Sequence, residues 1–415
     1  MLPNHAPPPP QAATLLPRTA LELKKSTIVA SPELFSDDIL RLFHEYPELD
    51  TIPVIEDTHP IGLINRHVFM NEMARPYVRE IYGRKSCIAF MDKHPLIIEE
   101  TTPIQELSFQ ALAAGQKALS DGFIIVRNGS YTGVGSGFDL VDAVTKLQAE
   151  KSRMVMESIE YASVIQRSFL RPSQRDLATH LPDHLLHWEP RDVVGGDFFV
   201  FRTFNDGYFI AIIDCTGHGV PGAFMTLIMA SFLDRILQHD NPRDPAEVMT
   251  KMNRMIKGAL AQDGDIHHDG SDDGMDTAFM WFNSAERLLT WASAKIPLFI
   301  VTPPTNNTAS DAKIEQMNGE RMGVGYRTTP MQHTWVNHSA HLAPGASVFV
   351  TTDGFIDQPG GKKRIAFGKK RLKNTLLEHH ALALKDQGEH IMQTFRAYQA
   401  EQRRRDDVTF FGFRP

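Results

Sequence analysis

The feature that most constrains the fold is an internal repeat between residues 26 and 146. When the sequence is shifted by 71 positions, residues 52–70 (IPVIEDTHPIGLINRHVFM) align with residues 123–141 (FIIVRNGSYTGVGSGFDLV) without a gap. Each copy has the pattern helix, strand, tight turn, strand, helix, with Asp57 and Asn128 in the turns. The repeat therefore predicts two copies of one small α/β unit.

A pair of such units resembles the tandem CBS domain, a sensor module whose two halves pack into one disc and often bind adenine nucleotides in the cleft. In that family a serine or threonine and an aspartate three residues later hold the ribose and the phosphate. The second copy has this pair as Ser136 and Asp139, whereas the first has Asn65 and Val68. The resemblance thus implies at most one nucleotide site per chain. The alternative is that Ser136 and Asp139 simply cap the following helix.

A long helix is predicted over residues 139–170, because this stretch contains no proline or glycine. Lys151 and Ser158 occupy two of the seam positions of a heptad pattern. The apolar residues at heptad spacing are Leu140, Val144, Leu147, Met154, Tyr161 and Ile165. We interpret residues 139–171 as a helical linker for signalling, in a homodimer organised by the linker and the sensor domain together. The alternative is an ordinary amphipathic helix that lies on its own domain.

After Pro172, acidic residues fall at the ends of predicted strands. Asp197 and Asp214 flank a hairpin with the turn sequence Asn205-Asp206-Gly207, and counting outward from the turn places them opposite one another or one residue out of register. Directly opposed residues have Cβ atoms about 5 Å apart. Two carboxylates in that arrangement would repel each other without a cation.

A second pair of aspartates follows the same pattern further along the chain. The strand in GASVFVTTDGFIDQ ends on Asp353, and the segment RRRDDVTFF contains Asp406 and Asp407 before it continues as a strand. If these strands pair antiparallel, Asp353 and Asp406 meet at one end of a sheet. Four aspartates without a matching set of histidines or cysteines favour Mg²⁺ or Mn²⁺, which take oxygen ligands. Two such ions can polarise a phosphoryl group and deprotonate a bridging water for in-line attack.

Six segments, in this order, resemble the metal-dependent PPM (protein phosphatase 2C) family, in particular its bacterial SpoIIE-like serine phosphatases. The segments are EPRDVVGGDFF, DCTGHGVPGAFM, GMDTAF, VTTDGFIDQPGG, FGKKRL and RDDVTFF. Members of the family are αββα sandwiches that hydrolyse phosphoserine or phosphothreonine with two bound Mg²⁺ or Mn²⁺ ions. The resemblance implies that residues 172–415 form such a domain.

The resemblance also implies a role for each catalytic aspartate. Asp214 would bridge both metal ions, and the backbone carbonyl of Cys215 would complete one of the two sites. Asp353 and Asp406 would hold the first ion, and Asp197 would hold the second directly or through water.

Three further positions fit the family pattern less closely. Asp272 lies five residues before Thr277, where some relatives place a ligand for a third, weak metal, but a solvated flap is the alternative. Arg191 is the nearest candidate for gripping a substrate phosphate, although the arginine of eukaryotic relatives does not align with it. Lys295 replaces the small or amide residue that the family pattern leads us to expect.

Three rival functions come from other classes. A dinucleotide-dependent oxidoreductase would explain the glycines from Gly217 to Gly222, but it needs a second strand that ends in an acid about 20 residues on, and helical patterns follow instead. A diguanylate cyclase is suggested by GGDFF, yet Phe198 stands where a glutamate is expected. A CBS signalling protein that binds a ligand and carries a degenerate phosphatase domain is the remaining alternative, against which the intact set of four aspartates argues.

Length and composition limit the remaining possibilities. The 415 residues suffice for two or three domains, the net charge of −7 argues against nucleic-acid binding, and residues 1–25 read as a disordered, proline-rich leader. No apolar run approaches the roughly 18 residues of a membrane span, and the two cysteines are too few for a disulfide framework. We therefore expect a cytoplasmic α/β (α+β) protein without membrane or nucleic-acid partners. Its expected substrate is a phosphorylated regulatory protein, such as an anti-sigma-factor antagonist of the STAS type.

Overall fold

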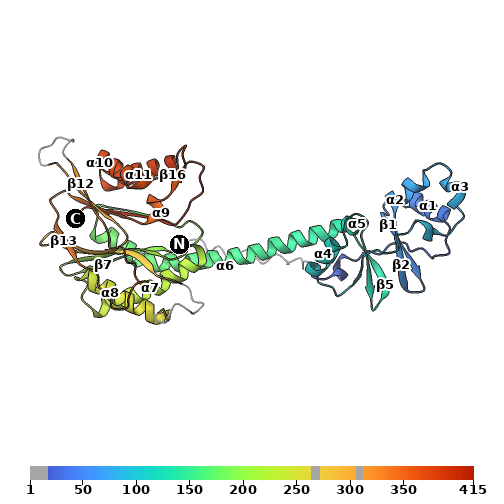
Figure 1. Cartoon of the computed structure of the whole chain (residues 1–415), viewed down its shortest axis with the longest axis horizontal. Coiled ribbons are helices and arrows are strands. Elements are labelled where there is room, and N and C mark those ends of the chain that lie inside the picture. Colours follow the sequence, from blue (N-terminus) through green and yellow to red (C-terminus); the bar gives the residue numbers. More distant parts are fainter. Residues whose placement is uncertain (1–16, 263–271, 305–311) are drawn as a thin grey trace, which may run out of the picture. The chain divides into compact units, whose positions relative to one another are not determined.

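The computed structural model describes residues 17–262, 272–304 and 312–415. The chain divides into two compact units, residues 1–155 and residues 156–415. Figure 1 shows the elements of both units.

The first unit contains the elements of both sequence repeats. Its elements are η1 (Ala20–Leu23), α1 (Ser36–Glu45), β1 (Thr51–Glu56), β2 (His59–Asn65), α2 (Arg66–Met73), α3 (Val78–Tyr82), η2 (Cys87–Phe90), β3 (Ile97–Glu99), α4 (Ile104–Ala113), α5 (Gln116–Ser120), β4 (Phe123–Arg127), β5 (Ser130–Gly135) and the start of α6 (Gly137–His180). The strands β1 and β2 pair antiparallel, and so do β4 and β5.

The two copies agree even in backbone conformation. Asp57 and Asn128, which occupy equivalent positions in the repeat, both adopt a left-handed conformation in their turns, with φ of 54° and 50°. Aspartate and asparagine are the residues that tolerate this conformation best after glycine. Each copy encloses its own group of buried side chains, and Leu63, Ile124 and Val126 form a small cluster between the copies. The helix, strand, turn, strand, helix pattern predicted from the repeat is confirmed.

The predicted disordered leader is too long. Residues 1–16 lie outside the described residues, but residues 20–23 form a short helix, and Ala20 and Leu23 are buried in the core of the second copy. The backbone N–H of Ala20 donates to the carbonyl of Thr102, which fixes this segment against the repeat. Burial of these two apolar side chains explains why residues 17–25 belong to the first unit.

The helix α6 runs from Gly137 to His180, well beyond the predicted end at residue 170, and Pro172 lies inside it. A proline in a helix lacks the N–H donor of one backbone hydrogen bond. Buried apolar side chains on both sides of the proline, Leu170 and Leu177, anchor this part of the helix in the core of the second unit. Tertiary packing therefore carries the helix through the residue at which the sequence analysis ended the linker.

The second unit consists of two five-stranded sheets and the helices that cover them. Its elements after α6 are β6 (His184–Glu189), β7 (Asp197–Phe204), β8 (Gly207–Cys215), α7 (Gly219–His239), α8 (Pro245–Ala259), β9 (Met275–Asn283), β10 (Leu288–Ala294), β11 (Leu298–Thr302), β12 (Lys313–Met317), β13 (His338–His341), β14 (Ser347–Thr351), α9 (Asp353–Ile356), β15 (Pro359–Gly360), β16 (Ile365–Ala366), α10 (Gly368–Glu378), α11 (Leu384–Gln399) and β17 (Val408–Phe413).

The order of the strands is β13-β10-β9-β8-β7 in one sheet and β12-β11-β14-β17-β6 in the other. One large core fills the space between the sheets and continues under α7 and α8, which cover the first sheet. The helices α10 and α11 cover the other sheet (Figure 1). A second core of aliphatic and phenylalanine side chains lies between them and this sheet. This is the predicted αββα sandwich.

Helix α7 corrects one expectation drawn from composition. By length and apolar character it is the one helix in the described chain that could cross a membrane, although no such segment was predicted. Its side chains of Met225, Met229 and Leu233 are buried in the core of the sandwich. Its apolar composition is thus explained by packing on the first sheet.

Candidate metal and active site

Two aspartates face each other at the open end of the hairpin β7–β8. Asp197 and Asp214 are direct partners in the antiparallel register, as counted from the turn. Burial and the negative charge of Asp407 raise the pKa of Asp197 well above its usual value. Burial and the charges of Asp197 and Asp353 do the same for the pKa of Asp214. Each carboxylate therefore needs a proton or a cation to be stable here.

Asp197 is held by the opposite sheet as well as by its own. Its Oδ2 atom accepts hydrogen bonds from the hydroxyls of Thr352 and Thr409, both at 2.8 Å. Thr409 lies in β17 and Thr352 directly follows β14, so these bonds cross the interior of the sandwich. The sequence analysis missed both threonines, because their role depends on how two sheets stack.

The other two predicted ligands lie at the end of the second sheet. Strands β14 and β17 pair antiparallel, which brings the segments that carry Asp353 and Asp406 together, as predicted. Burial and then the charge of Asp406 raise the pKa of Asp353 to about 6, although a hydrogen bond with Asp214 acts in the opposite direction. Asp353 is thus in contact with the aspartates of both sheets.

Two glycine segments let the backbone approach this cluster closely. A Cβ atom on Gly196 would lie 2.4 Å from the carbonyl oxygen of Gly217 and 2.8 Å from that of Cys215, so no larger residue fits. Gly217 and Gly219 have φ of 82° and 64°, in the left-handed region that favours glycine. The carbonyl of Cys215, which the sequence analysis named as a ligand, therefore lies where two loops meet.

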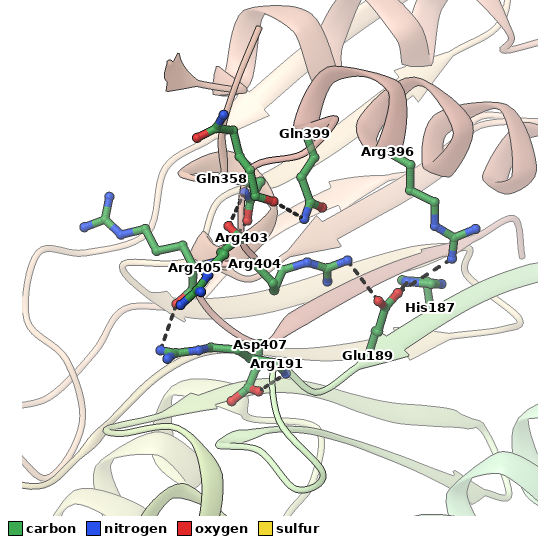
Figure 2. A network of polar contacts seen from close by, with 11 residues as sticks. His187, Glu189, Arg191, Gln358, Arg396, Gln399, Arg403, Arg404, Arg405 and Asp407 are labelled. Carbon is green, nitrogen blue, oxygen red and sulfur yellow. Dashed lines mark hydrogen bonds and ion pairs between the residues drawn. The ribbon is translucent and has the colours of Figure 1, made fainter. Parts of the chain in front are cut away.

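Asp407, the residue after Asp406, holds these loops in place. Its carboxylate accepts the backbone N–H groups of Arg191 and Gly196, both at 2.6 Å. Figure 2 shows the bond from Arg191, whose guanidinium also donates to the carbonyl of Arg405 at 3.2 Å. Arg191 is exposed and takes part in this hydrogen-bond network.

The same network fixes the edge strand β6 to the segment before β17 (Figure 2). Glu189 receives hydrogen bonds from His187 and from Arg404, at 2.8 and 2.9 Å, and pairs with Arg396 at 3.6 Å. The bond from His187, together with the charge of Arg404, lowers the pKa of Glu189 to about 2 despite its partial burial. Glu189 is thus a structural carboxylate whose negative charge is balanced by neighbouring arginines, unlike the aspartates of the cluster.

A fifth carboxylate, which the sequence analysis did not assign, joins the cluster from β9. Asp276 is the register partner of Asp214 on the side of β8 that faces away from β7. Its Oδ1 atom lies 2.9 Å from the ammonium of Lys295, and its carboxylate forms a hydrogen bond with Tyr326. The motif GMDTAF contains Asp276, but its role depends on the pairing of β8 with β9, which two helices separate in the sequence.

Asp272 does not join these carboxylates. Its Oδ1 atom accepts the backbone N–H of Arg327 at 2.7 Å, and it is not among the charges that raise the pKa of Asp214. The next residue, Asp273, accepts a hydrogen bond from the hydroxyl of Thr216 at 3.0 Å. The structure thus leaves Asp272 on a neighbouring loop. The predicted ligands that it does bring together are Asp197, Asp214, Asp353 and Asp406.

The chemistry of the cluster fits hard divalent cations. Its side-chain donors are all carboxylate oxygens, and within the described residues neither Asp197 nor Asp214 forms an ion pair. In this part of the chain no three acidic, histidine or cysteine side chains already converge as a finished ligand set. Cations that bind here would relieve the mutual repulsion of the carboxylates.

The predicted nucleotide residues lie in the first unit. Ser136 donates a hydrogen bond of 2.5 Å to Asp139, and the backbone N–H of Asp139 donates to the Ser136 hydroxyl at 3.1 Å, as in a helix cap. Lys25 pairs with Asp139 at 2.5 Å. All three residues line a cleft of about 540 Å³, so a capping role and a binding role are compatible.

Comparison with known proteins adds independent evidence. The family model described as stage II sporulation protein E (SpoIIE) matches residues 205–415. The SiaA-PP2C domain of Pseudomonas aeruginosa shares 34% sequence identity, with a TM-score of 0.56, over 64% of this chain and 99% of that domain. A SpoIIE structure from Bacillus subtilis, comprising its PP2C phosphatase domain and a fragment of its regulatory domain, shares 15% identity with a TM-score of 0.43, over 56% of this chain and 62% of that one. No curated protein matches the chain.

Proposed function

Because the chain belongs to the SpoIIE family of PP2C-type phosphatases, we propose that it hydrolyses phosphoserine or phosphothreonine on a regulatory partner protein in a metal-dependent reaction. The observation that carries this proposal is the opposed pair Asp197 and Asp214, with Asp353 in contact from the second sheet. The mutual repulsion of these buried carboxylates opposes folding, so the cluster is explained by the binding of cations.

The residues that would hold two Mg²⁺ or Mn²⁺ ions are the four predicted aspartates. The charges of Asp197 from the first sheet and of Asp353 and Asp406 from the end of the second all act on Asp214, which supports a bridging role. Asp197, fixed by two threonine hydroxyls, supports a ligand role from the opposite side. When bound, the two ions would supply Lewis acidity toward the phosphoryl group and an activated water for in-line attack.

The chain itself contributes positioning. The hydroxyls of Thr352 and Thr409 orient Asp197, and the glycines of the two loops allow backbone to approach the reaction site. The carboxylate of Asp407 accepts the backbone N–H of Gly196 and so holds this loop in place. Fixed carboxylates of this kind keep a site organised before substrate arrives, which is a large part of catalysis by charged groups.

A direct test is phosphate release from a phosphoserine peptide by the purified full chain in the presence of Mn²⁺. We expect turnover that a chelator abolishes and that Asp353→Asn removes. Asp386→Asn changes an exposed aspartate in the first turn of α11 and should leave turnover unchanged. Equal turnover with Mn²⁺ and with chelator would contradict the proposal. Absence of turnover under both conditions would favour a binding protein with a degenerate phosphatase domain.

The first unit is proposed to be the sensor, a tandem CBS domain with at most one adenine-nucleotide site per chain. Ser136, Asp139 and Lys25 in the cleft support this proposal, and the first copy offers Asn65 and the exposed Val68 at the equivalent positions. A partner of the STAS type, such as an anti-sigma-factor antagonist, is our proposed substrate. The family likeness supports a regulatory role, and a cytoplasmic location fits it.

We further propose a homodimer in which α6 takes part. Several large apolar side chains of this helix are exposed in the single chain, among them Met154, Tyr161 and Ile165 of the predicted heptad positions. Burying such a row against a second copy would remove it from water.

A further inference from the structure

Lys295 is the one position of the family pattern for which the sequence offered no explanation. It lies in the turn between β10 and β11 with φ of 62°, a left-handed conformation that is uncommon for lysine. Its backbone N–H donates to the carbonyl of Glu320 at 2.7 Å, which fixes the turn. The side chain extends from this turn to the fifth carboxylate of the cluster.

The ammonium of Lys295 is held on two sides. It lies 2.9 Å from Oδ1 of Asp276 and 4.4 Å from the centre of the Tyr326 ring, which attracts cations through its face. The Oδ1 atom of Asp276 is fully buried, and the segment of Gly323 closes over it, because a Cβ atom there would lie 2.7 Å from Oδ1. The Asp276 side chain as a whole is partly buried, and a nearby positive charge stabilises a carboxylate whose oxygen is removed from water in this way.

Asp276 is equivalent to Asp197 in its relation to Asp214. Both are register partners of Asp214, one in β7 and one in β9. Directly opposed residues lie about 5 Å apart at their Cβ atoms, so Asp276 is as well placed as Asp197 to share a cation with Asp214. Lys295 already supplies Asp276 with a positive charge.

We propose that the ammonium of Lys295 occupies the position beside Asp276 that a further metal ion would otherwise take. Lys295 thereby limits the metal ligands to the other four aspartates. The proposal rests on the proposed two-metal function. It makes Lys295 a positioning residue that sets how many ions the acidic cluster takes up.

The test is Mn²⁺ binding to the full chain by calorimetry, together with thermal unfolding of the metal-free protein. We expect Lys295→Met to bind one more Mn²⁺ per chain than the wild type, because Asp276 is released. The metal-free Lys295→Met protein should melt at a lower temperature, because the partly buried carboxylate of Asp276 has lost its counter-charge. The double variant Lys295→Met/Asp276→Asn should restore both the wild-type stoichiometry and most of the melting temperature.

Lys295→Arg is the matched control, since it keeps the charge, and it should behave as the wild type. If Lys295→Met does not fold, Lys295→Gln replaces it in the same measurements. Equal Mn²⁺ stoichiometry in the wild type and the charge-removed variant would overturn the proposal, even if the melting temperatures differ. If the wild type binds no Mn²⁺ at all, the proposed two-metal function fails and this proposal fails with it. If the wild type binds two ions, the two-metal function stands, and the stoichiometry of the variants tests the role of Lys295 alone.

Discussion

At the scale of single residues, the site is defined by carboxylates whose surroundings oppose their charge. Burial is the largest cause of the raised pKa values of Asp197, Asp214 and Asp353, and neighbouring carboxylates add to it. Glu189, which lies shortly before Asp197 in the sequence, has a pKa shifted in the opposite direction because it accepts a hydrogen bond from His187 and lies beside the charged Arg404. The opposite directions of these pKa shifts distinguish the aspartate cluster, which needs bound cations, from the network of Glu189, which already contains arginines.

The central residue of this site is Asp214, and its replacement is our first prediction. Asp214→Asn removes a charge from the position in contact with both sheets, and we expect phosphatase activity to fall roughly a thousandfold or more, about 4 kcal/mol of barrier. Cys215→Ala keeps the backbone carbonyl and should retain most of the activity. Both variants are assayed with p-nitrophenyl phosphate while Mn²⁺ is titrated. A folded Asp214→Asn variant within tenfold of wild type would show that the two-metal assignment is wrong.

The pH dependence of metal binding follows from the same carboxylates. The pKa of Asp353 is about 6 in the folded chain, and an aspartate in an unfolded chain has a pKa of about 3.9. The folded, metal-free form therefore binds more protons in this window, and its stability falls as the pH rises from about 4 to about 6. Mn²⁺ needs deprotonated ligands, so its stabilising effect should grow over the same range.

Thermal unfolding of the full chain at about pH 5 and about pH 7.5, with Mn²⁺ or with chelator, measures this second prediction. We expect a larger increase in melting temperature on adding Mn²⁺ at the higher pH. Asp214→Asn should reduce that increase at both pH values. An equal increase at both pH values in the wild type would mean that these carboxylates do not hold the metal.

At the scale of elements, helix α6 is tied directly to the loop that leads into Asp197. The side chain of Gln166 is buried, and its amide donates to the carbonyl of Gly195 at 2.7 Å and to the Thr226 hydroxyl at 3.0 Å. The N–H of Gly195 donates back to the Gln166 carbonyl oxygen at 3.3 Å. The helix thus fixes the backbone just before Asp197.

Removing this clamp is the third prediction. Gln166→Leu leaves the buried N–H and carbonyl of Gly195 without partners, which typically costs about 1–3 kcal/mol. We expect lower stability and weaker Mn²⁺ binding. Ser168→Ala is the matched control on the same helix, since its hydroxyl donates within the helix, to the carbonyl of Ile165. If Gln166→Leu binds Mn²⁺ as the wild type does, the helix supports the fold without influencing the metal site.

At the scale of the whole molecule, the first and the second unit each carry one candidate site. The fourth prediction concerns the cleft of the first unit, where Asp139→Ala should weaken the binding of ATP, ADP or AMP to the full chain, measured by calorimetry. Asp142→Ala, on the same helix and paired with Lys146, is the control that should bind normally. Unchanged binding in Asp139→Ala would remove the nucleotide from this position.

Light scattering on the full-length protein tests the proposed homodimer. A monomeric full-length protein would contradict the dimer, and with it the proposed role of the exposed apolar side chains of α6.

The sequence alone was sufficient where the physics is local or periodic. The internal repeat predicted the elements of both copies, because equivalent apolar positions and turn residues form equivalent local structure. The hairpin turn at residues 205–207 predicted Asp197 opposite Asp214 or one residue out of register, because a tight turn limits the register of a hairpin, and the structure has the direct pairing. The resemblance in six motifs indicated the sandwich and the four aspartates that the structure brings together.

Tertiary structure decided what depends on long-range packing. Buried Leu177 carries α6 past Pro172, and buried Ala20 and Leu23 bring part of the expected leader into the first unit. The fifth carboxylate joins the cluster through strands that are distant in the sequence, and its lysine partner reaches it from another turn. The two threonines that fix Asp197 do so because two sheets stack. Local sequence carries no signal for such contacts, since their free energy arises only when distant segments share one buried space.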